Sequence, residues 1–289
     1  MKITIVNTRT DESISMDSYV FGEGVLITEF DPGSIPATFN KIKGVNQNGV
    51  FRTETTLETR PMELTAIILN SSRSSIEAVK SQIDNVLNPL DELKFLYTSE
   101  NIIKECLCAV GSTPKYAVEN ILNSNEALEF KVSFECFNPF WMDQTETVLN
   151  VETWEDGFEF EFELVDDGIE FAKKGANEIE ILNGTVQAPI EIFFTGPALN
   201  PKITLNNKEF IKVNKSIDET DTLYIKTNYG ETAVEIRKPS GTEQAYNYLD
   251  IESKFFSLNP GKNTLVYATD GDFLPQSVII QYKKHYLSL

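Results

Sequence analysis

Residues 134–143, FECFNPFWMD, place three Phe, one Trp and one Met around a single Asn-Pro step. The segment just before them, LEFKVSF, alternates apolar and polar residues with the period of two that is typical of a half-buried strand. Pro139 has no N–H to donate, so a central strand cannot continue through it. After Met142 the sequence DQTETVLN is polar. We therefore expect one domain to end here, which divides the chain into residues 1–142 and 143–289.

The aromatic residues of this stretch are candidates for sealing the junction between the two domains. A buried Phe or Trp side chain hides about 150–250 Å² of surface, so three of them can hold a linker rigidly. The predicted junction residues are Phe137, Pro139, Phe140 and Trp141. The alternative is an ordinary last core strand with no special role.

Upstream of the junction, alternation with period two predicts mostly antiparallel strands. One helix is predicted among them. Ser74 and Glu77 form a capping box. Apolar residues then recur at helical spacing from Ile76 to Leu87, and Pro89 ends the pattern.

A long connection follows the second predicted strand, YVFGEGVLITEF. Residues 31–51, DPGSIPATFNKIKGVNQNGVF, are rich in Gly, Pro and Asn and are too many for an ordinary loop. Asn48-Gly49 is a signal for a hairpin turn. Apolar side chains along the segment argue against simple disorder: Phe39, Ile42, Val45, Val50 and Phe51.

The second half of the chain has a different pattern. Short strands separated by turn residues, without a helix signal between them, are typical of a β-sandwich or jelly roll. FEFEFEL, residues 158–164, predicts a strand with one apolar and one acidic face. Residues 151–180 hold eleven acidic and two basic residues. A calcium site near residues 166–168 is conceivable, but the D-x-[DN]-x-[DN]-G spacing is missing, so a solvated acidic face is favoured.

Charge and composition exclude several classes of protein. The formal net charge is −19, which argues against stable nucleic-acid binding, because phosphate contacts need clustered Lys and Arg. The same sign suits a channel that lets DNA pass without holding it. No apolar run is long enough for membrane insertion, and the first residues lack the pattern of a secretory signal.

Neither a metal, a cofactor nor an enzymatic activity is predicted. The three cysteines, Cys106, Cys108 and Cys136, are expected to be reduced and buried, and no second pair at zinc-finger spacing accompanies them. His285 is the single histidine and is expected to be a partly exposed structural residue. Nucleophile and phosphate-binding motifs are missing, and paired carboxylates arise by chance among 44 acidic residues.

Four segments, in this order, carry a family resemblance over nearly the whole chain: FECFNPFW at 134–141, PIEIFFTGPALNPKITLNN at 189–207, DTLYIKT at 221–227 and LNPGKNTL at 258–265. Together they resemble the distal tail proteins of long-tailed bacteriophages, the Dit family. The resemblance implies a mainly β protein. Its N-terminal part would be a split-barrel-like antiparallel domain with one helix, and its C-terminal part a galectin-like or jelly-roll sandwich.

The resemblance also implies a structural role at the host-facing end of a virion tail. Six copies would form a ring through residues 1–142, and the belt, residues 31–51, would embrace the neighbouring copy. The ring would join the tail tube protein to a tail-associated or baseplate hub protein and to a receptor-binding protein. It would be assembled in the bacterial host cytoplasm, and DNA would pass through its channel.

A second hypothesis belongs to another class, a carbohydrate-binding module for host adhesion. Galectin-like sandwiches bind sugars with an exposed aromatic platform and polar neighbours. The candidate glycan contacts are Trp154, Tyr246 and Tyr248. Fold alone does not separate the two hypotheses.

Overall fold

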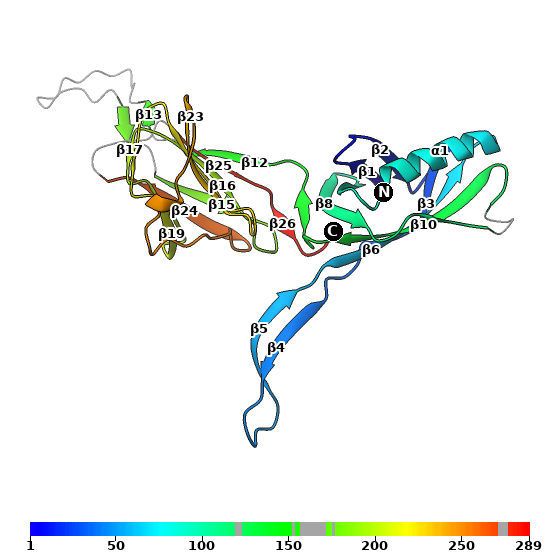
Figure 1. Cartoon of the computed structure of the whole chain (residues 1–289), viewed down its shortest axis with the longest axis horizontal. Helices are drawn as coiled ribbons and strands as arrows, with labels where there is room; N and C mark the ends of the chain where they lie inside the picture. The colour runs from blue at the N-terminus through cyan, green and yellow to red at the C-terminus, as the bar shows by residue number, and fades with distance from the viewer. Residues whose placement is uncertain (119–122, 152–153, 157–171, 175–176, 271–276) are drawn as a thin grey trace, which may run out of the picture. The chain divides into compact units, whose positions relative to one another are not determined.

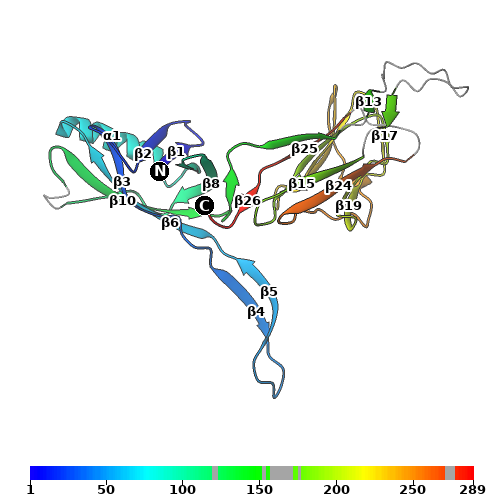
Figure 2. The same cartoon turned by 180° about the vertical axis from the view of Figure 1, so that it is seen from behind.

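The computed structural model describes residues 1–118, 123–151, 154–156, 172–174, 177–270 and 277–289. The chain divides into two compact units (Figures 1 and 2). The first comprises Met1–Gln144 and Tyr286–Leu289, and the second comprises Thr145–His285. The predicted strand 158–164 and the conceivable calcium site at 166–168 lie outside the described residues.

The first unit is a closed barrel with an extended edge. Its sheet runs in the order β26-β11-β8-β7-β1-β2-β3-β6-β10-β9, and a further pairing of β8 with β10 closes seven of these strands into a ring. The strands are β1 (Lys2–Asn7), β2 (Ser13–Asp17), β3 (Gly24–Asp31), β6 (Arg60–Leu69), β7 (Leu93–Ser99), β8 (Ile102–Val110), β9 (Lys115–Tyr116), β10 (Ala127–Cys136), β11 (Trp141–Asp143) and β26 (His285–Tyr286). The predicted split-barrel-like β domain is confirmed, with one parallel step where Asp17 lies opposite Leu26.

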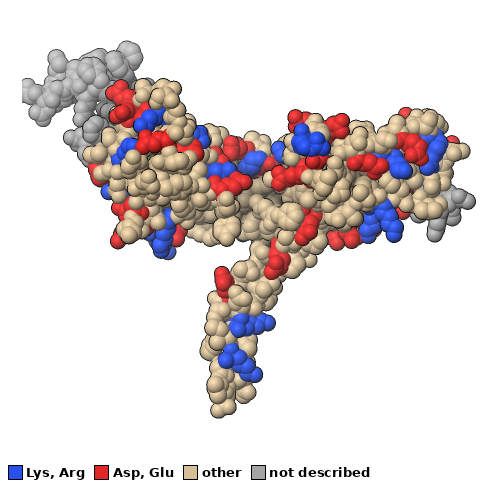
Figure 3. All heavy atoms as spheres, in the orientation of Figure 1, with Lys and Arg blue, Asp and Glu red and all other residues tan. Residues whose placement is uncertain are grey.

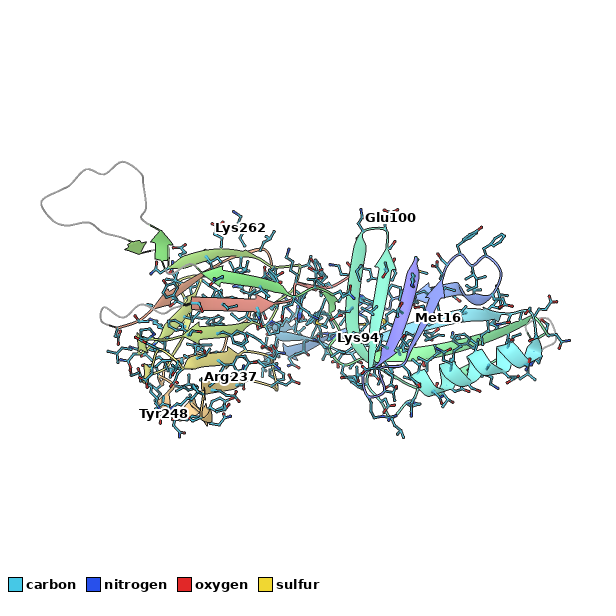
Figure 4. The ribbon with its side chains drawn as sticks, turned by 90° about the horizontal axis from the view of Figure 1, so that it is seen from above. Met16, Lys94, Glu100, Arg237, Tyr248 and Lys262 are labelled. Atoms are coloured by element: carbon cyan, nitrogen blue, oxygen red, sulfur yellow. The ribbon has the colours of Figure 1, made fainter. Side chains whose placement is uncertain are left out.

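Alternating burial along the strands shows why this sequence closes a barrel. β6 has the pattern BeBeBiBiBi and β10 the pattern iBiBeBiBeB, where B is buried, i half-buried and e exposed, so each strand turns every second side chain inward. The core packs around Phe95, whose ring meets those of Phe134 and Trp141 edge to face at 5.4 and 6.0 Å between centroids. Figure 4 labels three residues of this unit, Met16 on β2, Lys94 on β7 and Glu100 in the β7–β8 turn.

One helix, α1 (Arg73–Val86), packs against β1, β2 and β6. It buries Ile76, Ile83 and Val86, as the apolar spacing predicts. The predicted capping box is wrong by two residues, because Ser72 is the N-cap and its hydroxyl accepts from the Ser75 N–H at 3.3 Å. Glu77 is instead paired with Arg73 one turn earlier, at 2.6 Å.

The predicted long connection is a protruding β-hairpin of the first unit (Figures 1 and 2). Its arms are β4 (Ala37–Ile42) and β5 (Phe51–Leu57), which pair only with each other. The tip, residues 43–50, is longer than a two-residue Asn-Gly turn, although Gly49 has the left-handed φ of +85° that such turns need. The second arm reaches Leu57, beyond the predicted segment 31–51.

The second unit is a β-sandwich, as predicted. One sheet has the order β12-β25-β16-β21-β22-β23, the other the order β15-β24-β18-β19, and β13-β14 and β17-β20 are separate pairs. The elements are β12 (Thr147–Val151), β13 (Trp154–Asp156), β14 (Ala172–Lys174), β15 (Glu178–Leu182), β16 (Glu191–Thr195), β17 (Ala198–Leu199), β18 (Lys202–Leu205), β19 (Glu209–Lys212), β20 (Ser216–Ile217), β21 (Thr222–Lys226), β22 (Ala233–Lys238), β23 (Gly241–Gln244), the 3-10 turn η1 (Tyr246–Tyr248), β24 (Lys262–Ala268) and β25 (Ser277–Tyr282). Alternate residues of both sheets form one core, which includes Ile192, Phe194 and Leu265.

The C-terminal residues differ from the sequence-based division of the chain. QSVIIQYKKHYL was expected to pair within the second domain, and its first part does so as β25, between β12 and β16. Its last part forms β26, which lies beside β11 in the sheet of the first unit. Lys283 and Lys284 interrupt the alternation between these two strands, and the chain passes from the second unit to the first between His285 and Tyr286.

Candidate functional site

The β4–β5 hairpin has no core of its own. Every residue of both strands is exposed. The five apolar residues singled out in the sequence are all exposed on it, from Phe39 at 44% to Val45 at 95%. An isolated two-stranded hairpin is at best marginally stable in water, so this element is suited to a partner surface.

Strand register sorts the hairpin side chains onto two faces. Phe39 lies opposite Thr55, and Ile42 lies opposite Phe51. Because residues directly opposite share a face and successive residues alternate, Phe39 lies on one face and the Ile42–Phe51 pair on the other. A β-bulge between Asn40 and Lys41 twists the ribbon at its middle.

The base of the hairpin is fixed by backbone geometry. The Glu58 N–H donates to the Pro36 carbonyl at 2.9 Å, where the two arms leave the barrel. Gly33 has a φ of +70°, and a Cβ atom there would lie 1.6 Å from the Pro61 carbonyl oxygen. Only Gly fits this close approach, so Gly33 sets the direction in which the chain enters the hairpin.

A buried arginine joins this base to other parts of the first unit. Arg60 is 2% exposed. Its Nη1 donates to Pro32 O at 3.3 Å and to Gly33 O at 2.9 Å. Its Nε donates to Pro139 O at 2.7 Å, and its Nη2 donates to Leu287 O at 2.6 Å. Burial lowers the pKa of Arg60, because the charged guanidinium is removed from water.

The predicted junction residues differ in burial: Trp141 lies in the core of the first unit, whereas Phe137 faces solvent. Trp141 is fully buried, and the Arg60 guanidinium lies 5.7 Å from the centre of its ring. Phe140 is half-buried. Phe137 is 68% exposed and does not seal the sheet, because β10 ends at Cys136 and the chain turns outward before Pro139.

The three cysteines form a buried cluster of free thiols between β8 and β10. The sulfurs of Cys106 and Cys136 are 3.5 Å apart. Hydrogen bonding to Cys136, together with burial, raises the pKa values of Cys106 and Cys108, which keeps both as neutral thiols. Within the described ranges, no group of three or more His, Cys, Asp or Glu side chains is arranged to hold a metal ion.

His285 lies deeper than expected. It is 5% exposed, not partly exposed, because its backbone carbonyl accepts from the Thr185 N–H and so draws this strand end into the second unit. Burial lowers the pKa of His285 to about 4, so the ring is neutral at pH 7.

In the part of the chain that the structure describes, no helix has both the length and the apolar character that a membrane span needs.

The predicted glycan contacts do not form a common platform in the described residues. The Tyr248 ring, on the second unit in Figure 4, is covered by the Lys215 ammonium at 4.0 Å, and its hydroxyl donates to Glu243 at 3.0 Å. Tyr246 is 42% exposed, and its hydroxyl donates to the Thr232 carbonyl. The backbone of Trp154 lies in β13, but its side chain lies outside the described residues.

Two family models match the sequence, one in each half. The phage tail protein RIFT-related domain matches residues 19–136. The siphovirus-type tail component, C-terminal domain, labelled for the Dit of phage SPP1, matches residues 183–286. The chain belongs to the siphovirus distal tail (Dit) family. It is therefore a structural component of a phage tail.

Solved structures share the Dit fold. The crystal structure of the SPP1 Dit protein, described as a paradigm of the hub adsorption apparatus in phages that infect Gram-positive bacteria, is similar over 98% of this chain and 99% of its own, with a TM-score of 0.65 and 14% identity. Chains from the baseplate of phage p2, in its activated conformation with Ca and with Sr, match over 100% of both chains with a TM-score of 0.51 and 11% identity. No curated protein matches the sequence.

Sequence reasoning missed the two residues that fix the base of the hairpin, Arg60 and Gly33. Arg60 stands in the ordinary polar segment LETRPME, and its acceptors lie 27 to 227 positions away in the sequence. Gly33 stands in the Gly- and Pro-rich start of the long connection, but the sequence does not reveal its close approach to Pro61.

Proposed function

We propose that six copies of this chain form a ring at the distal end of a siphovirus tail, in which the β4–β5 hairpin of each copy embraces the next. The observation that carries the proposal is the hairpin itself, whose strand residues are all exposed and whose apolar side chains face solvent in the described part of the chain. A heterologous contact of this kind, repeated with a closing rotation, generates a ring. The site is then the predicted belt, residues 31–51, together with the rest of the second arm to Leu57. Its interface residues would be Phe39, Ile42, Val45, Val50 and Phe51.

The ring would connect the tail tube protein to a baseplate hub protein and to a receptor-binding protein, and it would have no enzymatic activity. It would assemble in the host cytoplasm. DNA would pass through its channel without stable binding, and the net charge of −19 supports this role, because an acidic lining repels phosphate. The similarity to chains of a phage p2 baseplate supports a place in a baseplate assembly.

Glycan binding by the second unit remains the alternative proposal. It has less support, since Tyr248 has its ring face covered by Lys215. A glycan array with the full-length chain tests it. Binding that is lost on Tyr246→Ala but kept on Tyr229→Ala, another exposed tyrosine, would favour this second role.

Deletion of the hairpin tests the ring. Residues 37–57 are replaced by a Gly-Ser pair, since Pro36 and Glu58 are already joined by a backbone hydrogen bond. Negative-stain images and light scattering of the wild-type chain should show six-fold rings with a central hole, and the deletion variant should be a folded monomer. Rings of normal stability from the deletion variant would refute the proposal.

A matched pair of substitutions separates the apolar contact from general surface effects. Ile42→Ser with Phe51→Ser removes the apolar pair of the hairpin. Tyr229→Ser with Ile251→Ser removes two large side chains of the second unit that are even more exposed. We expect ring formation to be lost only in the first variant.

A further inference from the structure

The hairpin differs in charge from the rest of the chain. Residues 37–57 contain three basic residues, Lys41, Lys43 and Arg52, and one acidic residue, Glu54. The hairpin therefore carries a formal charge of +2, while the rest of a chain with a total of −19 carries −21. Figure 3 shows Lys and Arg side chains gathered on the outer half of the hairpin, beyond acidic side chains nearer its base.

Two of these cations lie directly opposite each other. Lys41 is the register partner of Arg52, so both side chains share a face of the ribbon. The Lys41 ammonium also lies 5.7 Å from the centre of the Phe39 ring, which places Phe39 on the same face. Like charges directly opposite destabilise a strand pair, so the free hairpin holds an unfavourable arrangement.

No carboxylate among the described residues of the same chain relieves this repulsion. Glu54 is opposite Asn40, whose amide donates to it at 3.4 Å, so it belongs to the other face. Among the described residues, no Asp or Glu lies within salt-bridge distance of Lys41, Lys43 or Arg52. An exposed strand pair with like charges directly opposite each other, and with no described carboxylate nearby to offset them, indicates that a partner molecule supplies the opposite charge.

We infer that the face formed by Phe39, Lys41 and Arg52 binds carboxylate groups on the surface of a second copy of this chain. The inference rests on the proposed ring and adds the chemistry of the receiving surface. Arg and Lys pair with carboxylates through charge-assisted hydrogen bonds, and the −21 charge outside the hairpin supplies them. Phosphate groups of nucleic acid are a poorer match, because three cations make too few contacts for useful affinity at physiological salt.

The opposite face of the hairpin needs a different surface. Ile42 and Phe51 form an exposed apolar pair there. The hairpin would therefore be held on one face by charge and on the other by apolar burial. The two contributions respond differently to salt, because salt screens exposed charges and leaves apolar burial in place.

Charge reversal in the full-length chain is the first test. Lys41→Glu with Arg52→Glu should lower the association constant between copies about a hundredfold, because like charges brought together across an interface repel strongly. Lys208→Glu with Lys262→Glu, at exposed positions of the second unit, makes the same change in net charge and should leave assembly unchanged. Mass photometry across a salt series measures both.

Salt dependence gives the second readout. The association constant between wild-type copies should fall on the order of tenfold as the NaCl concentration rises from 0.05 to 0.5 M. The neutral variant Lys41→Gln with Arg52→Gln should assemble more weakly and lose most of this dependence. The inference is wrong if the charge-reversed variant, Lys41→Glu with Arg52→Glu, assembles like the wild type. It is also wrong if assembly of the wild type and of the neutral variant depends equally on salt.

A zero-length carbodiimide crosslink identifies the acceptor directly. Rings assembled from mixed light and nitrogen-15-labelled chains should give Lys41 or Lys43 peptides joined to Asp or Glu peptides of the other isotope. Rings without such mixed crosslinks would overturn the inference, and so would crosslinks only within one chain. Failure of the proposed function is distinct, because it requires that the hairpin-deleted chain still forms rings.

Discussion

At the scale of single residues, the first unit depends on a cation that has carbonyl groups as its partners. The Arg60 guanidinium donates hydrogen bonds to the backbone carbonyl groups of Pro32, Gly33, Pro139 and Leu287. These acceptors belong to the hairpin base, the junction and the C-terminal segment. Carbonyl oxygens carry only partial charge, and among the described residues no carboxylate lies within salt-bridge distance of this guanidinium. Its value lies in fixing three backbone segments with one side chain.

Arg60→Met should destabilise the first unit by about 3 kcal/mol, because several buried carbonyl groups lose their donor while the apolar stem is kept. Urea unfolding followed by tryptophan fluorescence measures this, since Trp141 lies against the guanidinium. Arg52→Met, at an exposed position of the hairpin, is the control and should change the stability of the monomer by no more than about 0.5 kcal/mol.

Gly33→Ala and Gly49→Ala form a second matched pair. Both glycines have positive φ, but the new Cβ would lie 1.6 Å from a backbone oxygen at Gly33 and meets nothing within 4 Å at Gly49. We expect Gly49→Ala to cost about 1 kcal/mol of local strain and Gly33→Ala to lower the melting temperature clearly more. Equal melting temperatures would show that the backbone at Gly33 can move aside.

His285 gives a pH dependence with a defined sign. Its pKa is lowered from 6.5 to about 4 by burial, so the unfolded chain binds more protons between these values. The neutral His285 ring therefore contributes fully to the free energy of unfolding above pH 6.5, and this contribution is lost as the pH falls towards 4. It amounts to at most roughly 3 kcal/mol. Asp91 and Glu243, with pKa values of about 2, act at lower pH. The unfolding free energy of His285→Gln should therefore change less between pH 7 and 4 than that of the wild type.

At the scale of elements, the hairpin and the barrel strands should differ in local stability. β4 and β5 bury no side chain, whereas β6 and β10 place alternate residues in the core. In the monomer, amide hydrogens of β4 and β5 should exchange orders of magnitude faster than those of β6 and β10. On ring formation, the hairpin amides should become protected. Fast exchange that persists in the ring would show that the hairpin lies free there.

How much of each element was predictable depends on how local its determinants are. The apolar spacing of Ile76 and Ile83 predicted α1, because a helix records its buried face every three or four residues. The cap was misplaced, since Ser72 and Ser74 are both good N-cap residues and the local sequence does not choose between them. The exposed side chains of the hairpin were recognised by their excess in a long loop, not by any feature of a partner surface.

At the scale of the whole molecule, the two units have separate cores, and the C-terminal segment contributes to both: His285 ends the second unit, and Tyr286–Leu289 belong to the first. Residues 145–285 contain both sheets of the sandwich. This fragment should be soluble and show one cooperative thermal transition. The fragment 1–144 lacks β26 and the Leu287 carbonyl that Arg60 binds, so it should melt below the first unit of the full-length chain. A spectrum of a disordered chain from fragment 145–285 would mean that the boundary is misplaced.

The division of the final segment could not be predicted, because the break in alternation at Lys283 and Lys284 does not indicate which sheet each part joins. The sequence records which side chains are apolar, but it does not say which sheet receives them. Only the partners decide this, β16 for the first part and β11 for the last.

The chain passes between the units twice, at residues 144–145 and again at 285–286. A protease that cuts one of these connections therefore does not release the second unit, because the other peptide connection still holds it. In a virion exposed to digestive or bacterial proteases, both sites would have to be cut in the same subunit before the unit is lost. Partial digestion followed by gel filtration under native conditions should thus retain full mass, while denaturing gels reveal the nick.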